Sequence, residues 1–209
     1  MASGVVGDFL CRLYPIVCQI SEKFVGRDKG RRFEDVTSEE IYTLAYEQGF
    51  QPNPPRLTLD LPTISGNSHQ FDASFWHDAI WYLVECKNTK IAAMDYVYYF
   101  NAKILDYQYA SKTGDGFKGV FLSAVEVPDS AWRYSIAYGL RILDPVSPPL
   151  ELMMKSCDED PILGVALGRY LEKINSLSLN TWDLFEFNTV RMLEEYRYYC
   201  SRWRDLCAY

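Results

Sequence analysis

No stretch of the sequence approaches the roughly 20 consecutive apolar residues that a membrane-spanning helix needs. The start of the chain, Met1 to Phe9, also lacks the basic residues and the long apolar run of a signal peptide, and it carries Asp8 instead. Internal repeats and low-complexity tracts are absent as well. These absences argue against a membrane, secreted or repeat protein, and we expect an intracellular, cytoplasmic one.

Cysteine pairs of the C-x₂-C type are also missing. Cys11 and Cys18 are seven residues apart, as are Cys200 and Cys207, and two helical turns separate each pair by about 10 Å. That distance is too long for both thiols to bind one ion directly, so a zinc site is not expected. Without a secretion signal, the cysteines are predicted to be free thiols in a reducing compartment.

An excess of basic residues is lacking too. The chain has 28 acidic and 21 basic side chains and a formal net charge of −7, which argues against a general nucleic-acid binder. Basic residues nevertheless crowd together near one glycine-rich stretch, with only Asp28 opposing them. They are either contacts to a DNA backbone or a solvated loop. The candidate DNA contacts are Arg27, Lys29, Arg31 and Arg32.

The composition supports one packed domain over residues 1–209. Hydrophobic residues make up 48% of the 209 residues and aromatic residues 15%, which is ample for a core. Within this domain we expect a core at 26–145, an N-terminal helix at 1–25 and a C-terminal helical extension at 150–209 that packs on the core.

Hydrophobic periodicity predicts an alternation of strands and helices. Apolar residues recur at helical steps over 5–24, and Thr37-Ser38-Glu39-Glu40 resembles a capping box that starts a helix ended by Gly49. The other predicted elements are strands at 56–61, 70–75, 80–86, 119–125 and 140–143, and helices at 91–109, near 128 and, twice, within 161–209. This order predicts an α/β sandwich with a mixed sheet.

Two carboxylates and a lysine form the candidate site. Alternation along 80–87 puts Glu85 and Lys87 on one face and Cys86 on the other, and the hairpin can bring Asp72 close to Glu85. Such oxygens suit Mg²⁺, with the Cys86 carbonyl as a third ligand. Lys87 could then orient or deprotonate a water, or offset charge on a phosphate. The spacing is common, so a surface Glu–Lys pair beside a hairpin aspartate remains an open alternative.

The residues around this site resemble a known family. Phe71-Asp72-Ala73, followed by Tyr82-Leu83-Val84-Glu85-Cys86-Lys87-Asn88, is similar to the PD-(D/E)XK nuclease superfamily, closest to Mrr-like endonucleases. Gly30-Arg31-Arg32-Phe33-Glu34 resembles the family's first-helix motif, and Gly49-Phe50 the pair that ends that helix. The resemblance covers roughly Gly30 to Asp144 and implies a restriction-endonuclease-like α/β/α sandwich with a central mixed sheet. The extra helices that periodicity predicts at both termini lie outside it.

The resemblance also implies roles for these residues. Asp72 and Glu85 would be metal ligands, Lys87 the catalytic lysine and Glu34 a further carboxylate near the metal. Phe71 stands where the family often has proline. The long interval between Glu34 and Gly49 suggests that the helix restarts near Thr37, which leaves Glu40 as a substitute for Glu34.

The implied function is a Mg²⁺-dependent DNA endonuclease, with Mn²⁺ as a substitute, in restriction, repair or defence. The alternatives are a non-catalytic interaction module of this fold in a larger nucleic-acid-processing complex, a junction resolvase and an RNA-directed nuclease. The terminal helices could serve a homodimer or a protein partner, and no membrane is expected.

Four polar residues outside the site are predicted to be solvated surface, with contact of the lysine or glutamine with the cleaved strand, and approach of a histidine to the site, as the alternatives. Lys103 and Gln108 lie on the helix after the site, and His69 and His77 lie in or beside hairpin turns. The last helix mixes arginines with aromatic residues, and we expect it to pack on the first helix or to form a subunit interface.

Overall fold

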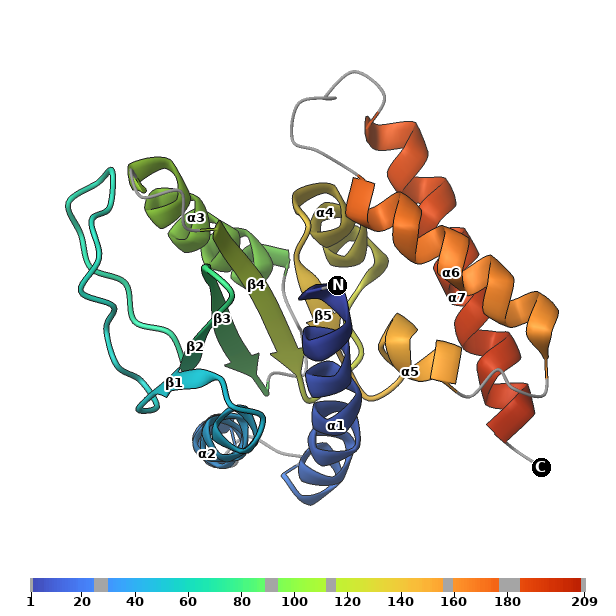
Figure 1. The fold of residues 1–209 in the computed structure, drawn as a ribbon, viewed down its shortest axis with the longest axis horizontal. Coiled ribbons are helices and arrows are strands. Elements are labelled where there is room, and N and C mark those ends of the chain that lie inside the picture. The colour runs from blue at the N-terminus through green and yellow to red at the C-terminus, as the bar shows by residue number, and fades with distance from the viewer. Residues whose placement is uncertain are drawn as a thin grey trace.

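The described part of the chain is built around one five-stranded sheet (Figure 1). The computed structural model describes residues 2–24, 30–88, 94–111, 116–155, 160–176 and 185–207. The strands lie side by side in chain order: β1 (Gln51–Asn53), β2 (Ala73–His77), β3 (Ile80–Lys87), β4 (Gly116–Ser123) and β5 (Arg141–Leu143).

Strand direction divides this sheet into two halves. β1, β2 and β3 pair antiparallel, whereas β3, β4 and β5 pair parallel. Parallel neighbours need a crossover connection, and two helices supply it: α3 (Met94–Ala110) and α4 (Asp129–Tyr138). The mixed sheet that the sequence predicts is thus confirmed.

Helices cover both faces of the sheet, as Figure 1 shows. α1 (Ala2–Lys23) and α2 (Gly30–Glu47) share one core with β2 and β3, and α3 and α4 belong to a second core. Successive residues of a strand point to opposite faces. Leu83 therefore joins the core under α3, and Val84 joins the core under α1 and α2. The predicted α/β/α sandwich is confirmed.

Aromatic rings fix the hairpin of β2 and β3 against α1. The ring centroid of Phe75 lies 4.8 Å from that of Phe9, 5.2 Å from that of Phe50 and 5.0 Å from that of Tyr82. Such pairs contribute about 0.5–1.5 kcal/mol each beyond the burial of their area. The hairpin that carries the candidate site is therefore held firmly from this side.

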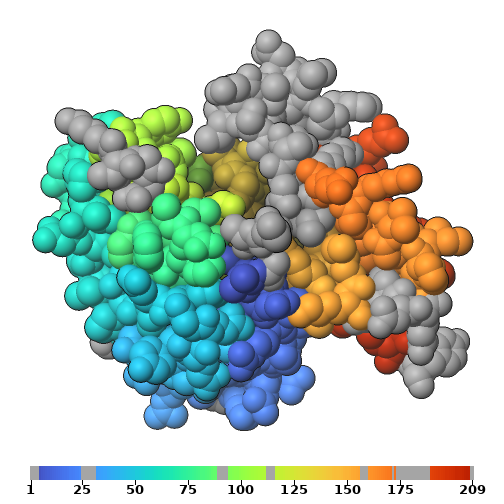
Figure 2. Space-filling view, viewed as in Figure 1, coloured from blue at the N-terminus to red at the C-terminus, as the bar shows by residue number. Residues whose placement is uncertain are grey.

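The C-terminal helices lie beyond β5 in the order α5 (Leu150–Lys155), α6 (Pro161–Ser176) and α7 (Phe185–Cys207). On the face drawn in Figure 2, the light-orange α5 lies between the blue α1 and the orange α6. The last helix packs mainly on α4, where Arg197 lies over the Trp132 ring, and not mainly on α1. Its other predicted use, a subunit interface, stays a prediction.

Two predicted boundaries in the first half are wrong. Residues 56–61 form no strand: Thr58 makes only an isolated bridge to Gln70, and the first strand is β1 instead. The second helix does not start at the capping box but at Gly30, so that Thr37 and Ser38 lie buried inside it. The Ser38 hydroxyl donates to the Glu34 carbonyl one turn earlier, which satisfies a serine within a helix.

A two-residue turn, Asp78-Ala79, joins β2 to β3. Asp78 and Ala79 both have positive φ, 48° and 60°, as type I′ hairpin turns require. This region suits glycine, and an ordinary side chain there costs about 1–2 kcal/mol. Ala79 therefore stores strain at the tip of the hairpin.

Two expectations about the whole chain can be compared with the described residues. No helix among them is long and apolar enough to cross a membrane. As the sequence predicts, the described cysteines are free thiols: Cys11, Cys18, Cys86, Cys200 and Cys207. Cys157 lies outside the described ranges.

We expect Ala79→Gly to raise the free energy of unfolding by about 1 kcal/mol, because glycine adopts positive φ without a Cβ clash. Chemical denaturation measures the change. Ala102→Gly on the exposed side of α3 is the control and should lower stability by about 1 kcal/mol. Equal destabilisation by both variants would contradict the strained turn.

Candidate functional site

The candidate residues meet at the carboxyl end of β3. Glu85 and Lys87 are the third-last and last residues of β3. Glu34 comes from α2, and Asp72 directly precedes β2. Ligands of open α/β sheets bind outside the carboxyl ends of the strands. The sheet thus brings four residues that are distant in sequence to the edge where ligands commonly bind.

A local irregularity aims Asp72 at this edge. The Asp72 N–H donates to the Val84 carbonyl at 3.1 Å, although the ladder pairs Val84 with Ala73. Asp72 and Ala73 thus both lie opposite Val84, as in a β-bulge. The regular alternation of side chains between the two faces of the sheet is interrupted there. Phe71 consequently packs in the core under α3, whereas Ala73 packs in the other core. The Asp72 Oδ2 atom accepts the Cys86 N–H at 2.7 Å.

The Lys87 ammonium stands among three carboxylates. Its Nζ lies 2.9 Å from Glu85 Oε1, 3.4 Å from Glu34 Oε1 and 3.7 Å from Asp72 Oδ2. The side chains of Asp72, Glu85 and Lys87 are only 12–15% exposed. A surface Glu–Lys pair does not describe this arrangement, since buried charges are retained only when they are paired.

Two further cations contact carboxylates at or beside the site. The Lys103 Nζ lies 3.1 Å from Glu85 Oε2 and 3.2 Å from the Gln70 carbonyl, so its prediction as solvated surface is wrong. Arg56 lies 2.6 Å from Asp35 Oδ1 and 3.9 Å from Glu34 Oε2. The place of Lys103 on the helix that follows the site was a sequence signal for a contact there, whereas no sequence signal linked Arg56 to α2.

The crowding of charges moves two pKa values. Burial, together with repulsion from Glu85, raises the pKa of Asp72 to about 6 despite the nearby Lys87. Burial alone would lower the pKa of Lys87, but attraction to Glu85, Asp72 and Glu34 outweighs it, and the pKa lies above its ordinary value. Without a bound cation, Lys87 therefore stays charged at neutral pH, while Asp72 binds a proton more readily than a free aspartate.

The oxygen atoms at this edge fit a hard divalent ion. Within a strand, the N–H and C=O of one residue point to the same side, so the Cys86 carbonyl faces the side on which its N–H meets Asp72. Asp72, Glu85 and this carbonyl supply oxygens alone, which Mg²⁺ prefers. The Cys86 side chain is buried in the core shared with α1 and α2, and so it is the carbonyl and not the sulfur that faces this edge.

A metal centre of another kind is not evident in the described ranges. No group of three or more His, Cys, Asp and Glu side chains in them is arranged to hold an ion. The candidate set differs from such a group because it combines two carboxylates with a backbone carbonyl. Lys87 stands beside both carboxylates and supplies positive charge there.

The continuous helix α2 decides which glutamate reaches the site. Because α2 starts at Gly30, Glu34 faces Lys87, while Glu40 lies exposed. Of the predicted DNA contacts, Arg27 and Lys29 lie outside the described residues, as does the side chain of Arg31. Arg32 is exposed on α2, two residues before Glu34. Their contact with DNA stays a prediction.

The other polar residues predicted to be exposed have partners. His69 Nε2 lies 2.7 Å from Asp106 Oδ2, and the His77 ring lies 4.5 Å from that of Phe50. Gln108 accepts the Phe117 N–H at 3.0 Å and so ties α3 to β4. Each of these residues supports the fold near the sheet.

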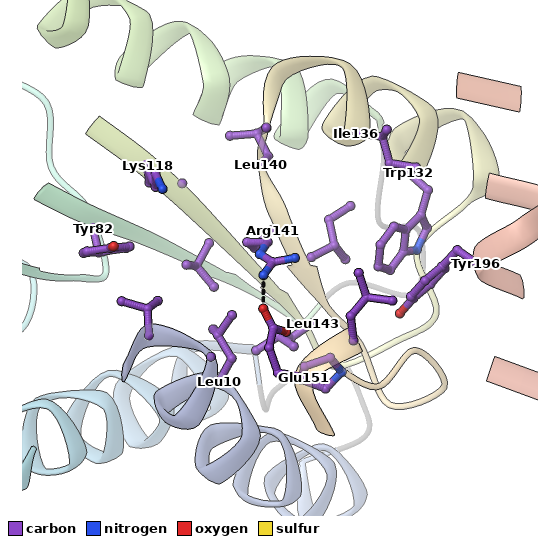
Figure 3. A pocket seen from close by; sticks show the side chains of 18 of the residues that line it. Leu10, Tyr82, Lys118, Trp132, Ile136, Leu140, Arg141, Leu143, Glu151 and Tyr196 are labelled. Atoms are coloured by element: carbon purple, nitrogen blue, oxygen red, sulfur yellow. Dashed lines mark hydrogen bonds and ion pairs between the residues drawn. The ribbon is translucent and has the colours of Figure 1, made fainter. Parts of the chain in front are cut away.

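A cavity of about 550 Å³ lies at the opposite end of the parallel strands. Figure 3 shows Arg141 and Glu151 pointing toward one another in it, with Trp132 and Tyr196 on one side and Tyr82 on the other. Glu151 is the one carboxylate of its described lining. Since a hard ion needs several such oxygens, this cavity is not the site that the sequence predicts.

We expect Asp72→Asn to stabilise the metal-free protein at neutral pH. The folded-state pKa of about 6 exceeds the ordinary 3.8, so the folded protein holds this proton more tightly, and its stability falls as pH rises through that interval. Above it, the ionised carboxylate costs on the order of 1–3 kcal/mol.

Denaturation of both proteins in chelator, between about pH 4 and about pH 8, measures the difference. The free energy of unfolding of Asp72→Asn should exceed that of the wild type by an amount that grows as pH rises. A gap that stays constant across this range would contradict the raised pKa.

Comparisons with known proteins give only distant likenesses. No protein-family model and no curated protein sequence matches the chain. The crystal structure of a protein of unknown function, AF1548, matches 80% of this chain and 98% of its own with 15% identity and a TM-score of 0.44. The small subunit of the heterodimeric restriction endonuclease R.BspD6I matches 88% of this chain and 98% of its own with 16% identity and a TM-score of 0.48. Likenesses this weak assign neither a family nor an activity to the chain.

Proposed function

We propose that this protein is a metal-dependent nuclease that hydrolyses phosphodiester bonds in DNA, as an endonuclease. The observation that carries the proposal is the convergence of Asp72, Glu85, Glu34 and Lys87 at the carboxyl end of β3. Three carboxylates and an ammonium that are mostly buried cost stability, so their retention favours a chemical role. The kinship with Mrr-like endonucleases and the setting in restriction, repair or defence remain predictions.

Asp72, Glu85 and the Cys86 carbonyl would hold Mg²⁺, or Mn²⁺ in its place. When bound, such an ion supplies positive charge to the phosphate and makes a water more acidic. Glu34 comes from α2, and its Oε1 atom lies 3.4 Å from Lys87 Nζ, so it is suited to hold Lys87 or an outer water. The raised pKa of Asp72 means that protons and the ion compete for this carboxylate.

Lys87 acts through its charge in this proposal. Of the roles that the sequence leaves open, proton removal requires a neutral amine, and the carboxylates around Lys87 raise its pKa and so disfavour that form. A fixed ammonium can instead orient a water and offset the charge that develops on the phosphate. Lys103 fixes the other oxygen of Glu85 and so holds that carboxylate in place.

We expect Lys87→Ala to lower the rate of DNA cleavage at least about 100-fold, because charge stabilisation at the phosphate is lost. The test incubates each protein with plasmid, linear and branched DNA, with and without Mg²⁺ or Mn²⁺. Lys118→Ala is the matched control: it removes an exposed lysine at the opposite end of the parallel strands and should cleave as the wild type does. Cleavage that persists unchanged in Lys87→Ala would overturn the assignment.

We also expect Mg²⁺ to raise the melting temperature of the wild-type protein but not of Glu85→Gln. An ion that binds only the folded chain at about 100 times its Kd stabilises by about 2.7 kcal/mol. The effect should weaken below about pH 6, where Asp72 is protonated. Equal melting with and without the ion, together with no cleavage of any DNA, would favour a non-catalytic interaction module of this fold.

A further inference from the structure

Two exposed tyrosines share one side of α3 with the lysine that contacts Glu85. Tyr96, Tyr99 and Lys103 follow one another at steps of three and four residues, which places them along one face of a helix. Tyr99 is 70% exposed and Tyr96 39%. Both rings are thus open to solvent on the side of α3 that carries Lys103, next to the site.

The direction of α3 carries these rings beyond the metal-binding residues. A helix that connects two parallel strands runs antiparallel to them, so the start of α3 lies toward the carboxyl end of β3. Lys103 contacts Glu85, and Tyr99 lies about 6 Å nearer the start of α3, with Tyr96 about 4.5 Å further. Lys103, Tyr99 and Tyr96 thus form a row that begins beside the site and leads away from it along the outside of the helix.

We propose that Tyr96 and Tyr99 stack on unpaired bases next to the cleaved phosphate, so that the substrate is DNA with a single-stranded segment, such as an overhang or a flap. This inference rests on the nuclease function proposed above. Tyrosine rings offer flat faces to bases, and in a duplex those faces are hidden by neighbouring bases. Lys103 gives the row a positive end at the site, where the phosphate would lie.

A protein partner is the competing occupant of this face, because tyrosine is also common in protein interfaces. One feature favours DNA: the row is continuous with the charged site, because Lys103 on the same face of α3 contacts Glu85. The exposed Asp95 beside them would repel phosphates, which directs the backbone toward Lys103 instead.

The test measures binding of the full chain, in chelator, to a labelled duplex with a single-stranded overhang and to a blunt duplex of the same sequence. Loss of a stacking ring weakens binding by about 5- to 150-fold, and we expect this for the overhang with Tyr96→Ala and Tyr99→Ala. Tyr99→Phe keeps the ring and should bind as the wild type does, whereas Tyr99→Leu keeps only the apolar character and should bind weakly.

Tyr109→Ala is the matched control, because Tyr109 is 67% exposed near the other end of the same helix and points about 120° away from Lys103. It should leave binding unchanged. Unchanged overhang binding by Tyr96→Ala and Tyr99→Ala would overturn the proposal, and so would an equal loss for the blunt duplex. Wild-type self-association that Tyr99→Ala abolishes would assign the face to a protein interface instead.

The result remains separable from the nuclease assignment. Tyrosine-dependent binding of overhangs without any metal-dependent cleavage would leave the stacking face standing while the nuclease function fails. Cleavage that depends on Lys87 but is the same in wild type, Tyr96→Ala and Tyr99→Ala would leave the nuclease and remove the stacking face. Melting temperatures of the variants should match that of the wild type, since both rings are exposed.

Discussion

The arrangement depends most on the attraction between the Lys87 ammonium and the carboxylates of Asp72, Glu85 and Glu34. These groups come from β3, from the segment before β2 and from α2, so one cation links three parts of the fold. Without Lys87, three carboxylates would repel one another in a partly buried place, which costs more than exposed repulsion because water screens it less. The site can therefore fold without metal. Repulsion between its carboxylates is only partly offset, as the raised pKa of Asp72 indicates.

That repulsion is consistent with a site selected for chemistry and not for stability. A stable core would place apolar residues at the end of β3, as it does at Leu83 and Val84. A divalent ion would relieve the crowding, because it neutralises Asp72 and Glu85 more fully than one ammonium can. It would also compete with Lys87 for both carboxylates and leave that ammonium available to a phosphate. The same electrostatics thus connects folding, ion binding and the proposed role of Lys87.

The sequence predicts the sandwich well because its main signals are local. Alternation in β3 and the apolar runs of β4 and β5 are each read from a few neighbouring residues, and strand alternation correctly separates Glu85 from Cys86. The failures involve contacts between distant segments. The bulge at Asp72, the contact of Lys103 with Glu85 and the pairing of Arg56 with Asp35 depend on the packing of helices against the sheet. The capping box at Thr37 was outweighed by burial of that residue in the core, which favours a continuous helix.

The acidity of the chain bears directly on how it would hold DNA. With a net charge of −7, long-range attraction to phosphates is weak, so release of counterions is confined to local basic residues such as those predicted at 27–32. Affinity then has to come from short-range contacts, and stacking of bases on aromatic rings depends little on net charge. The exposed Tyr96 and Tyr99 beside Lys103 offer such contacts where the phosphate would meet the site. An acidic nuclease with a stacking face would thus select DNA by the accessibility of its bases and not by its charge.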